Sequence, residues 1–324
     1  MSKLSVIIPS RQPEYLNKTI EDLLGKAAED IEIIVVLDGY WSDPPVKEDK
    51  RVRLIHFGAH RGMRDAINAG IRIAGGEYIM KTDEHCMFDE GFDRKLKQDC
   101  QDDWVVIPRR KRLDAENWKL IEDGRPDIDY MFVSYPYKEK WDRNCGLYGA
   151  EWREKGRERK DILIDDTPTM QGSCWFMPKA YFDKLLPGGM NAENYGPFNH
   201  EAQEISMTAW LSGGAIKVNK KTWYAHLHKG RGGKGYGFSN QQYRNFCTSK
   251  EKARRYAIDY WLITKDYKHD WKWFMEKFPN MPTWSENWEE RLKEDAKYDW
   301  RNDPSKNPTE WVELDKLSNP IYYL

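Results

Sequence analysis

A short polar segment that follows an apolar strand carries two side chains able to hold a metal ion. Residues 78–80 are apolar and follow two glycines, which predicts a buried strand of an α/β sheet. Asp83 and His85 lie two residues apart where this strand should end, so both can face the same way. Ligand crevices of open α/β sheets lie at such strand ends. A carboxylate with an imidazole suits Mn²⁺ or Mg²⁺, ions that also bind phosphate, although an Asp-x-His pair alone is common by chance.

Strands and helices alternate along the first third of the chain. The expected strands cover residues 4–9, 31–37, 52–56, 78–81 and 104–108, and the expected helices cover 14–28 and 62–74. This alternation predicts an α/β fold with a mostly parallel sheet and helices on both faces. No G-x-G-x-x-G follows the first strand and no P-loop pattern occurs, which argues against dinucleotide and P-loop sites.

The pattern changes twice after the fifth strand. Residues from about 111 to 166 form a charged, aromatic, turn-rich insert, and a helix is expected through 206–212. Beyond Tyr256 the chain carries Trp-rich amphipathic stretches. We therefore expect an α/β domain over residues 1–235, followed by an aromatic-rich, mainly helical extension over 236–324 that packs on the core.

Composition limits the class of protein. The 324 residues include 32% charged residues, with a net charge of −1 and a mean hydropathy of −0.87. No apolar run approaches the ~20 residues of a membrane span, and the amino-terminal residues lack a signal-peptide pattern. The five cysteines are scattered without a C-x-x-C pair, which is typical of reduced thiols. These features predict a cytoplasmic protein with no membrane association.

Charge is distributed unevenly along the chain. Residues 217–255 contain 11 Lys or Arg against one acid, Glu251, a net charge of +10. Glycines interrupt the first half of this basic block, so we interpret it as a loop that meets anions rather than a solvated helix face. Residues 266–316 contain 13 acids against 9 bases, so internal pairing between the two regions is the alternative.

Several short motifs, in order, resemble those of the GT-A glycosyltransferases, and specifically the polypeptide N-acetylgalactosaminyltransferase-like branch of the family 2-like group. The motifs lie at residues 5–10, 33–39, 74–86, 105–108, 168–172, 201–206 and 212–214, followed by His226 ten residues after Ile216. The resemblance covers residues 5–228 and implies a GT-A fold with a nucleotide-sugar-binding catalytic domain. No segment resembles the lectin module of that branch.

The resemblance also implies roles for individual residues. It makes His226 the third metal ligand, beside Asp83 and His85; a buried, hydrogen-bonded histidine is the alternative. It implies a UDP-sugar donor, with donor contacts from Pro9, Arg11, Asp38, Arg64, Asp83, Gly172, Arg231 and Lys234. Asp38 corresponds to the residue that faces the uracil ring, but an Asp before Gly39 is also a common turn former.

Two acidic residues, Glu201 and Glu204, are the candidate catalytic groups. We expect Glu201 to contact the sugar or the acceptor and Glu204 to support it, although acids at the start of a helix also favour its dipole. In inverting relatives an Asp follows the first Glu and acts as general base, whereas this chain has Ala202, which predicts retention of configuration. Ile67 stands where the branch usually carries Arg or Lys, so part of the donor contact differs.

The basic block has two interpretations. Arg231 and Lys234 resemble a lid that closes over the donor pyrophosphate. However, eleven cations interleaved with aromatic residues, together with the run at 109–112, also suit a nucleic-acid acceptor such as DNA with hydroxymethylated bases. A protein or small-molecule acceptor, a non-catalytic nucleotide-sugar-binding module and a nucleotidyltransferase are the alternatives.

Overall fold

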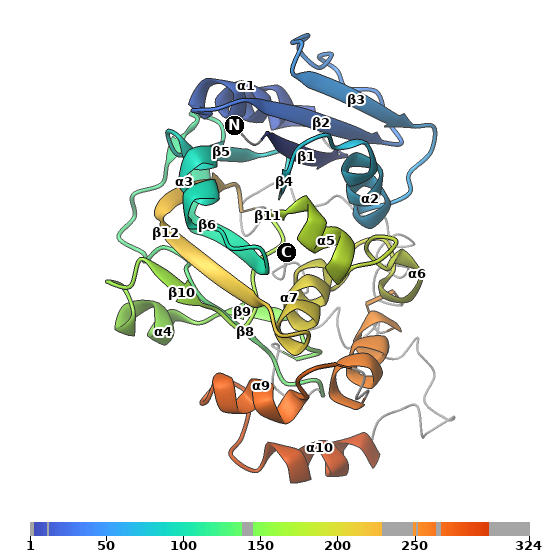
Figure 1. The fold of residues 1–324 in the computed structure, drawn as a ribbon, viewed down its shortest axis with the longest axis vertical. Helices are drawn as coiled ribbons and strands as arrows, with labels where there is room; N and C mark the ends of the chain where they lie inside the picture. Colours follow the sequence, from blue (N-terminus) through green and yellow to red (C-terminus); the bar gives the residue numbers. More distant parts are fainter. Residues whose placement is uncertain are drawn as a thin grey trace.

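A ten-stranded sheet forms the centre of the molecule (Figure 1). The computed structural model describes residues 3–11, 13–137, 145–228, 249–250, 252–263 and 267–297. The main strands are β1 (Leu4–Ser10), β2 (Ile31–Asp38), β3 (Val52–Phe57), β4 (Tyr78–Thr82), β6 (Trp104–Asp114), β10 (Ile164–Asp166), β11 (Cys174–Pro178) and β12 (Ala215–His226). They are ordered β10-β12-β6-β11-β4-β1-β2-β3, with β5 (Cys86–Phe88) paired to β12 and β7 (Lys119–Leu120) paired to β6.

Four of the seven neighbouring pairs in this main strand order run parallel. β1 pairs in parallel with β2 and β4, β2 with β3, and β6 with β12, whereas β11 is antiparallel to both of its neighbours. Every residue of β2 is buried, which is typical of a strand covered on both faces. This arrangement confirms the predicted α/β fold with a mostly parallel sheet.

Side chains that alternate along β1 divide the core between the two faces of the sheet. Ile7 belongs to a cluster on one face, with residues of α2 (Met63–Ile73), α5 (Lys179–Leu185) and α7 (Glu201–Leu211). Val6 and Ile8 belong to a second cluster, with residues of α1 (Leu16–Lys26) and α3 (Phe92–Asp99). At Gly70, a Cβ would lie only 2.6 Å from Ile7 Cγ2, so glycine permits α2 to approach β1 closely.

The insert is more integrated into the sheet than its sequence suggests. β6 extends to Asp114, past the expected end at residue 108, and β10 pairs with β12. Its other described regular elements are β7, the antiparallel pair β8 (Met131–Val133) and β9 (Gly149–Glu151), and α4 (Arg153–Glu158). The charged residues that suggest a loop are accommodated because several of them form ion pairs within the fold.

Aromatic side chains join the carboxyl-terminal helices to the core. Described elements here are a π-helix (Ile258–Ile263), α9 (Trp271–Lys277) and α10 (Trp288–Lys297), with α9 and α10 at the end of the molecule opposite β3 (Figure 1). The ring centroids of Trp210 in α7 and of Phe278 lie 5.1 Å apart. None of the helices in the described part of the chain is long and apolar enough to cross a membrane. The boundary between two domains near residue 235 lies outside the described residues and stays a prediction.

Candidate metal centre

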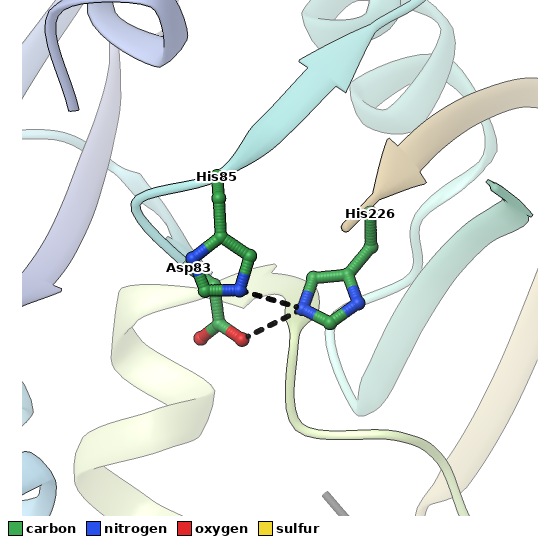
Figure 2. A group of neighbouring side chains, drawn as sticks. All are labelled: Asp83, His85 and His226. Carbon is green, nitrogen blue, oxygen red and sulfur yellow. Dashed lines mark hydrogen bonds and ion pairs between the residues drawn. The ribbon is translucent and has the colours of Figure 1, made fainter. Parts of the chain in front are cut away.

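Three side chains from distant parts of the chain converge where β4 ends (Figure 2). Asp83 follows β4 directly, and His85 precedes β5. His226 is the last residue of β12 and pairs with Cys86 of β5 in the antiparallel register. The β5–β12 pairing therefore brings His226 next to the Asp-x-His segment, although 143 residues separate it from Asp83.

The geometry of this cluster fits a bound divalent ion. One candidate ligand atom from each of the three residues lies within 4.8 Å of the others. His226 Nε2 lies 3.1 Å from His85 Nε2 and 3.2 Å from Asp83 Oδ2. Both histidines are buried, whereas the Asp83 side chain is 25% exposed, which leaves the cluster open on one side. One carboxylate and two imidazoles with an open side form a donor set that Mn²⁺ accepts.

The electrostatics keep the ligands in the forms that bind metal. Burial lowers the pKa of His226 to about 4, so its ring is neutral at physiological pH. Burial acts to raise the pKa of Asp83, but Lys81 and the hydrogen bond from His226 lower it more, so Asp83 is ionised. Neutral imidazole and ionised carboxylate are the metal-binding protonation states.

A buried ammonium group connects this cluster to the first turn of α7. Lys81 Nζ lies 2.6 Å from Asp83 Oδ1, 2.6 Å from the Gly172 carbonyl oxygen and 3.4 Å from Glu201 Oε2. The other oxygen of Glu201 accepts a 2.8 Å hydrogen bond from the indole of the buried Trp175. A Cβ on Gly172 would lie 2.6 Å from Glu201 Oε2, so a larger residue here would force this carboxylate to move. The structure thus places predicted Gly172 and Glu201 next to the metal cluster.

Arg64 of α2 and Glu204 of α7 form a second buried ion pair. Arg64 is fully buried; its Nη1 donates to Glu204 and its Nη2 donates to the Asn199 carbonyl oxygen at 2.6 Å. The guanidinium carbon also lies 4.7 Å from the centroid of the Tyr195 ring. The charge of Arg64 is thus compensated within the fold, and the supporting role expected for Glu204 stays a prediction. A donor contact by Arg64 stays a prediction.

The predicted uracil contact, Asp38, is engaged at the start of α2. Its two carboxylate oxygens accept hydrogen bonds from the backbone N–H groups of Arg61 and Gly62 at 2.7 and 2.9 Å. His60 Nδ1 lies 2.6 Å from Oδ2. Asp38 thus fixes the loop that enters α2, which is a larger structural role than a turn before Gly39, and its contact with a base stays a prediction.

The remaining predicted donor contacts divide into two groups. Pro9 and Arg11 lie at the carboxyl end of β1, where the Arg11 backbone N–H donates to Glu84 at 3.0 Å. Arg231 and Lys234 lie outside the described residues.

The role of Lys81 could not be predicted from the sequence, beyond its presence in the 81–86 segment. Its partners are close to it only in the folded chain.

Comparison with known proteins gives the family. The profile of the family "Glycosyl transferase family 2" matches residues 5–186, more than half of the chain. The chain belongs to glycosyltransferase family 2. This match confirms the family predicted from the sequence motifs.

Several curated relatives are N-acetylgalactosaminyltransferases. Polypeptide N-acetylgalactosaminyltransferase 12 of Mus musculus is 26% identical over 211 residues, which cover 61% of this chain and 34% of the relative. Probable N-acetylgalactosaminyltransferase 9 of Caenorhabditis elegans is 26% identical over 223 residues, 68% of this chain and 37% of the relative. The chain thus spans about a third of the length of these relatives.

A solved structure confirms the fold. The crystal structure of GalNAc-T7 with UDP, GalNAc and Mn²⁺ superposes with a TM-score of 0.61 at 17% sequence identity. The superposition covers 86% of this chain and 56% of that chain. The fold of this glycosyltransferase family member is therefore of the predicted GT-A type.

We expect Lys81→Met to destabilise the protein by about 3–5 kcal/mol at neutral pH, because it leaves the buried carboxylate of Glu201 and the partly buried carboxylate of Asp83 without their cation. Lys81 acts to lower the pKa of both Asp83 and Glu201, so the variant should raise both pKa values. The loss relative to wild type should therefore shrink as the pH falls and these groups take up protons. Urea unfolding of the wild type and the variant at several pH values measures this loss in the free energy of unfolding.

The matched control for this variant is Lys95→Met, which breaks a 2.6 Å pair with Asp89 on the surface, where Lys95 is 39% exposed. It should cost less than about 1 kcal/mol. Equal losses in the two variants would show that the Lys81 contacts contribute no more than a surface ion pair.

Proposed function

We propose that this chain is a metal-dependent glycosyltransferase that moves a sugar from a UDP-sugar to a hydroxyl group of an acceptor. The observation that carries the proposal is the convergence of Asp83, His85 and His226 at a strand end in a family 2 chain. The names of the relatives support an N-acetylhexosamine-type donor. The presence of UDP, GalNAc and Mn²⁺ in the GalNAc-T7 crystal supports the nucleotide and the metal.

The residues around the cluster have different roles in this reaction. A divalent ion held by the three ligands supplies Lewis-acid stabilisation of the negative charge on the leaving diphosphate. Lys81 keeps Asp83 and Glu201 in fixed positions through its two ion pairs. Glu201 lies between Gly172 and this ammonium, so it is the acidic side chain of α7 best placed to contact the sugar or the acceptor.

Retention of configuration is the stereochemical part of the proposal. Ala202, which follows Glu201, is apolar and 5% exposed, so it cannot act as a base. Glu201 is bonded to Lys81 and Trp175, and Glu204 is bonded to Arg64. Both carboxylates are thus committed to partners within the protein, which supports a reaction without an inverting base.

Metal-dependent turnover is the first expected outcome. With MnCl₂ and a panel of UDP-sugars, the wild-type chain should release UDP, and EDTA should abolish the release. Asp83→Ala and His226→Ala should each lower kcat by about 10²-fold or more, because one electrostatic stabiliser is worth that much. Asp89→Asn, outside the cluster, should keep wild-type kcat. Full turnover in EDTA, or no turnover with any donor, would support the alternative of a non-catalytic or metal-independent protein.

The anomeric configuration of the product tests retention. From an α-linked UDP-sugar we expect an α-linked product, which the anomeric proton coupling in NMR spectra identifies. A β-linked product would contradict retention and direct the search for a base to Glu201 and Glu204.

We further propose that the acceptor is a polyanion, with DNA bearing hydroxymethylated bases as its chemical type. Within the basic block, Lys217 and Lys221 already pair with Asp166 and Asp99 at 2.6 and 2.8 Å. The proposal therefore relies on the end of the block, where Lys250 lies 5.1 Å from the Tyr148 ring centroid, near the α7 end of the site. A cation beside an aromatic ring suits a stacked base with its phosphate.

The acceptor proposal predicts salt-dependent DNA binding. Reversing the charges of Lys250, Lys252, Arg254 and Arg255 together should weaken binding and reduce the dependence of log K on log salt by up to about 4, because fewer counterions are released. Filter binding at several salt concentrations measures both. The control, charge reversal of Lys217 and Lys221, should lower Tm and leave DNA affinity unchanged. Wild-type protein without DNA affinity at low salt would leave a protein or small-molecule acceptor.

A further inference from the structure

Strand β6 carries four consecutive cations at residues 109–112, and alternate members have different surroundings. Arg109 forms two hydrogen bonds with Asp129, at 2.9 and 2.8 Å, and Lys111 lies 3.4 Å from Asp127. Successive side chains of a strand point to opposite faces. Arg110 therefore lies on the other face of the strand, away from these two aspartates.

The guanidinium of Arg110 is a buried charge for which the described part of the chain supplies no acidic partner. Arg110 is 3% exposed, and among the described residues no carboxylate forms an ion pair with it. Its buried Nε has no hydrogen-bond partner. The other two deeply buried cations of the site, Arg64 and Lys81, each bond a carboxylate. A buried charge without a counter-ion is costly, so an anion from outside the chain would satisfy a need that the fold leaves open.

Arg110 lies directly beside the metal cluster. On β12, the partner of Arg110 in the parallel register is Tyr224, two residues before His226. Arg110 Nη2 lies 3.3 Å from His226 Nδ1, and His226 Nε2 faces Asp83 and His85. The guanidinium and the other candidate ligands of the cluster therefore lie at the two nitrogens of one imidazole ring.

Metal binding by His226 would also free this guanidinium. Arg110 can donate to Nδ1 only while that nitrogen carries no proton, because a guanidinium is a donor and never an acceptor. A neutral imidazole that ligates a metal through Nε2 carries its proton on Nδ1. The acceptor at 3.3 Å is then lost, and Arg110 needs another one.

We propose that Arg110 binds a phosphate oxyanion beside the Asp83–His85–His226 cluster, and that this anion is the diphosphate of the nucleotide-sugar donor. The inference rests on the proposed function for the identity of the donor. The binding site itself rests on the buried guanidinium, which pairs with no carboxylate of the described residues. Arginine suits the role because its planar set of N–H groups matches two phosphate oxygens at once.

The test compares ligands that differ only in phosphate. UDP and uridine are titrated by calorimetry into the full chain with MnCl₂, for the wild type, Arg110→Met and Arg110→Lys. We expect Arg110→Met to weaken UDP binding by about 10- to 100-fold and to leave uridine binding unchanged, since it removes charged hydrogen bonds to phosphate alone. The UDP affinity of Arg110→Lys should lie between those of the wild type and Arg110→Met. Inorganic pyrophosphate should raise the Tm of the wild type but not that of Arg110→Met.

Controls separate this role from a structural one. Arg109→Met, on the same strand, should lower Tm by breaking the Asp129 pair and should bind UDP as the wild type does. Arg110→Met should keep or raise Tm in the absence of ligand, because it removes an uncompensated charge. Equal losses of UDP and uridine affinity in Arg110→Met, or unchanged UDP affinity, would overturn the proposal.

Two further outcomes identify the source of the anion. If the UDP-saturated wild type still takes up inorganic phosphate and Arg110→Met does not, the anion belongs to the acceptor and the donor assignment is wrong. If the wild type binds no UDP, yet pyrophosphate protection still depends on Arg110, the phosphate site stands and the proposed UDP-sugar donor fails.

Discussion

The buried ammonium of Lys81 is the interaction on which the site depends most. It joins the end of β4, the loop before β11 and the first turn of α7 through contacts with Asp83, Gly172 and Glu201. A lone ammonium in this position would be costly, and two adjacent carboxylates without it would repel each other. The three groups are stable only together, so the orientation of a metal ligand and that of a candidate catalytic acid are set by one side chain.

A second ion pair applies the same constraint to α7. Arg64 from α2 meets Glu204, one helical turn after Glu201. The two ion pairs connect α7 to both α2 and β4, and the burial of every residue of α7 follows from its position between them. Arg110 differs from these two cations because none of the described residues supplies a carboxylate for it, which is why we assign its partner to the ligand.

Local patterns predicted most of the elements but few of the polar contacts. The expected strand at 31–37 and helix at 62–74 agree with β2 and α2 to within one residue, because apolar periodicity reports burial directly. β6 continues past its predicted end because charged residues beyond Pro108 are paired in space with the insert. The Asp-x-His pair has a local spacing that is visible in the sequence, whereas His226 was predicted as a metal ligand from the family resemblance. Arg64 and Glu204 are 140 residues apart, so no local pattern reports their pairing.

The position of β11 in the sheet has a consequence for synthesis of the protein on the ribosome. β11 lies between β4 and β6, so these two strands cannot join one sheet until residues 174–178 have been made. His226 follows Asp83 by 143 residues, which corresponds to roughly 7–30 s of elongation. During that interval the nascent chain has only two of the three candidate ligands, and the edge of the sheet is open. The order of translation therefore makes completion of the sheet and completion of the metal cluster late events that coincide.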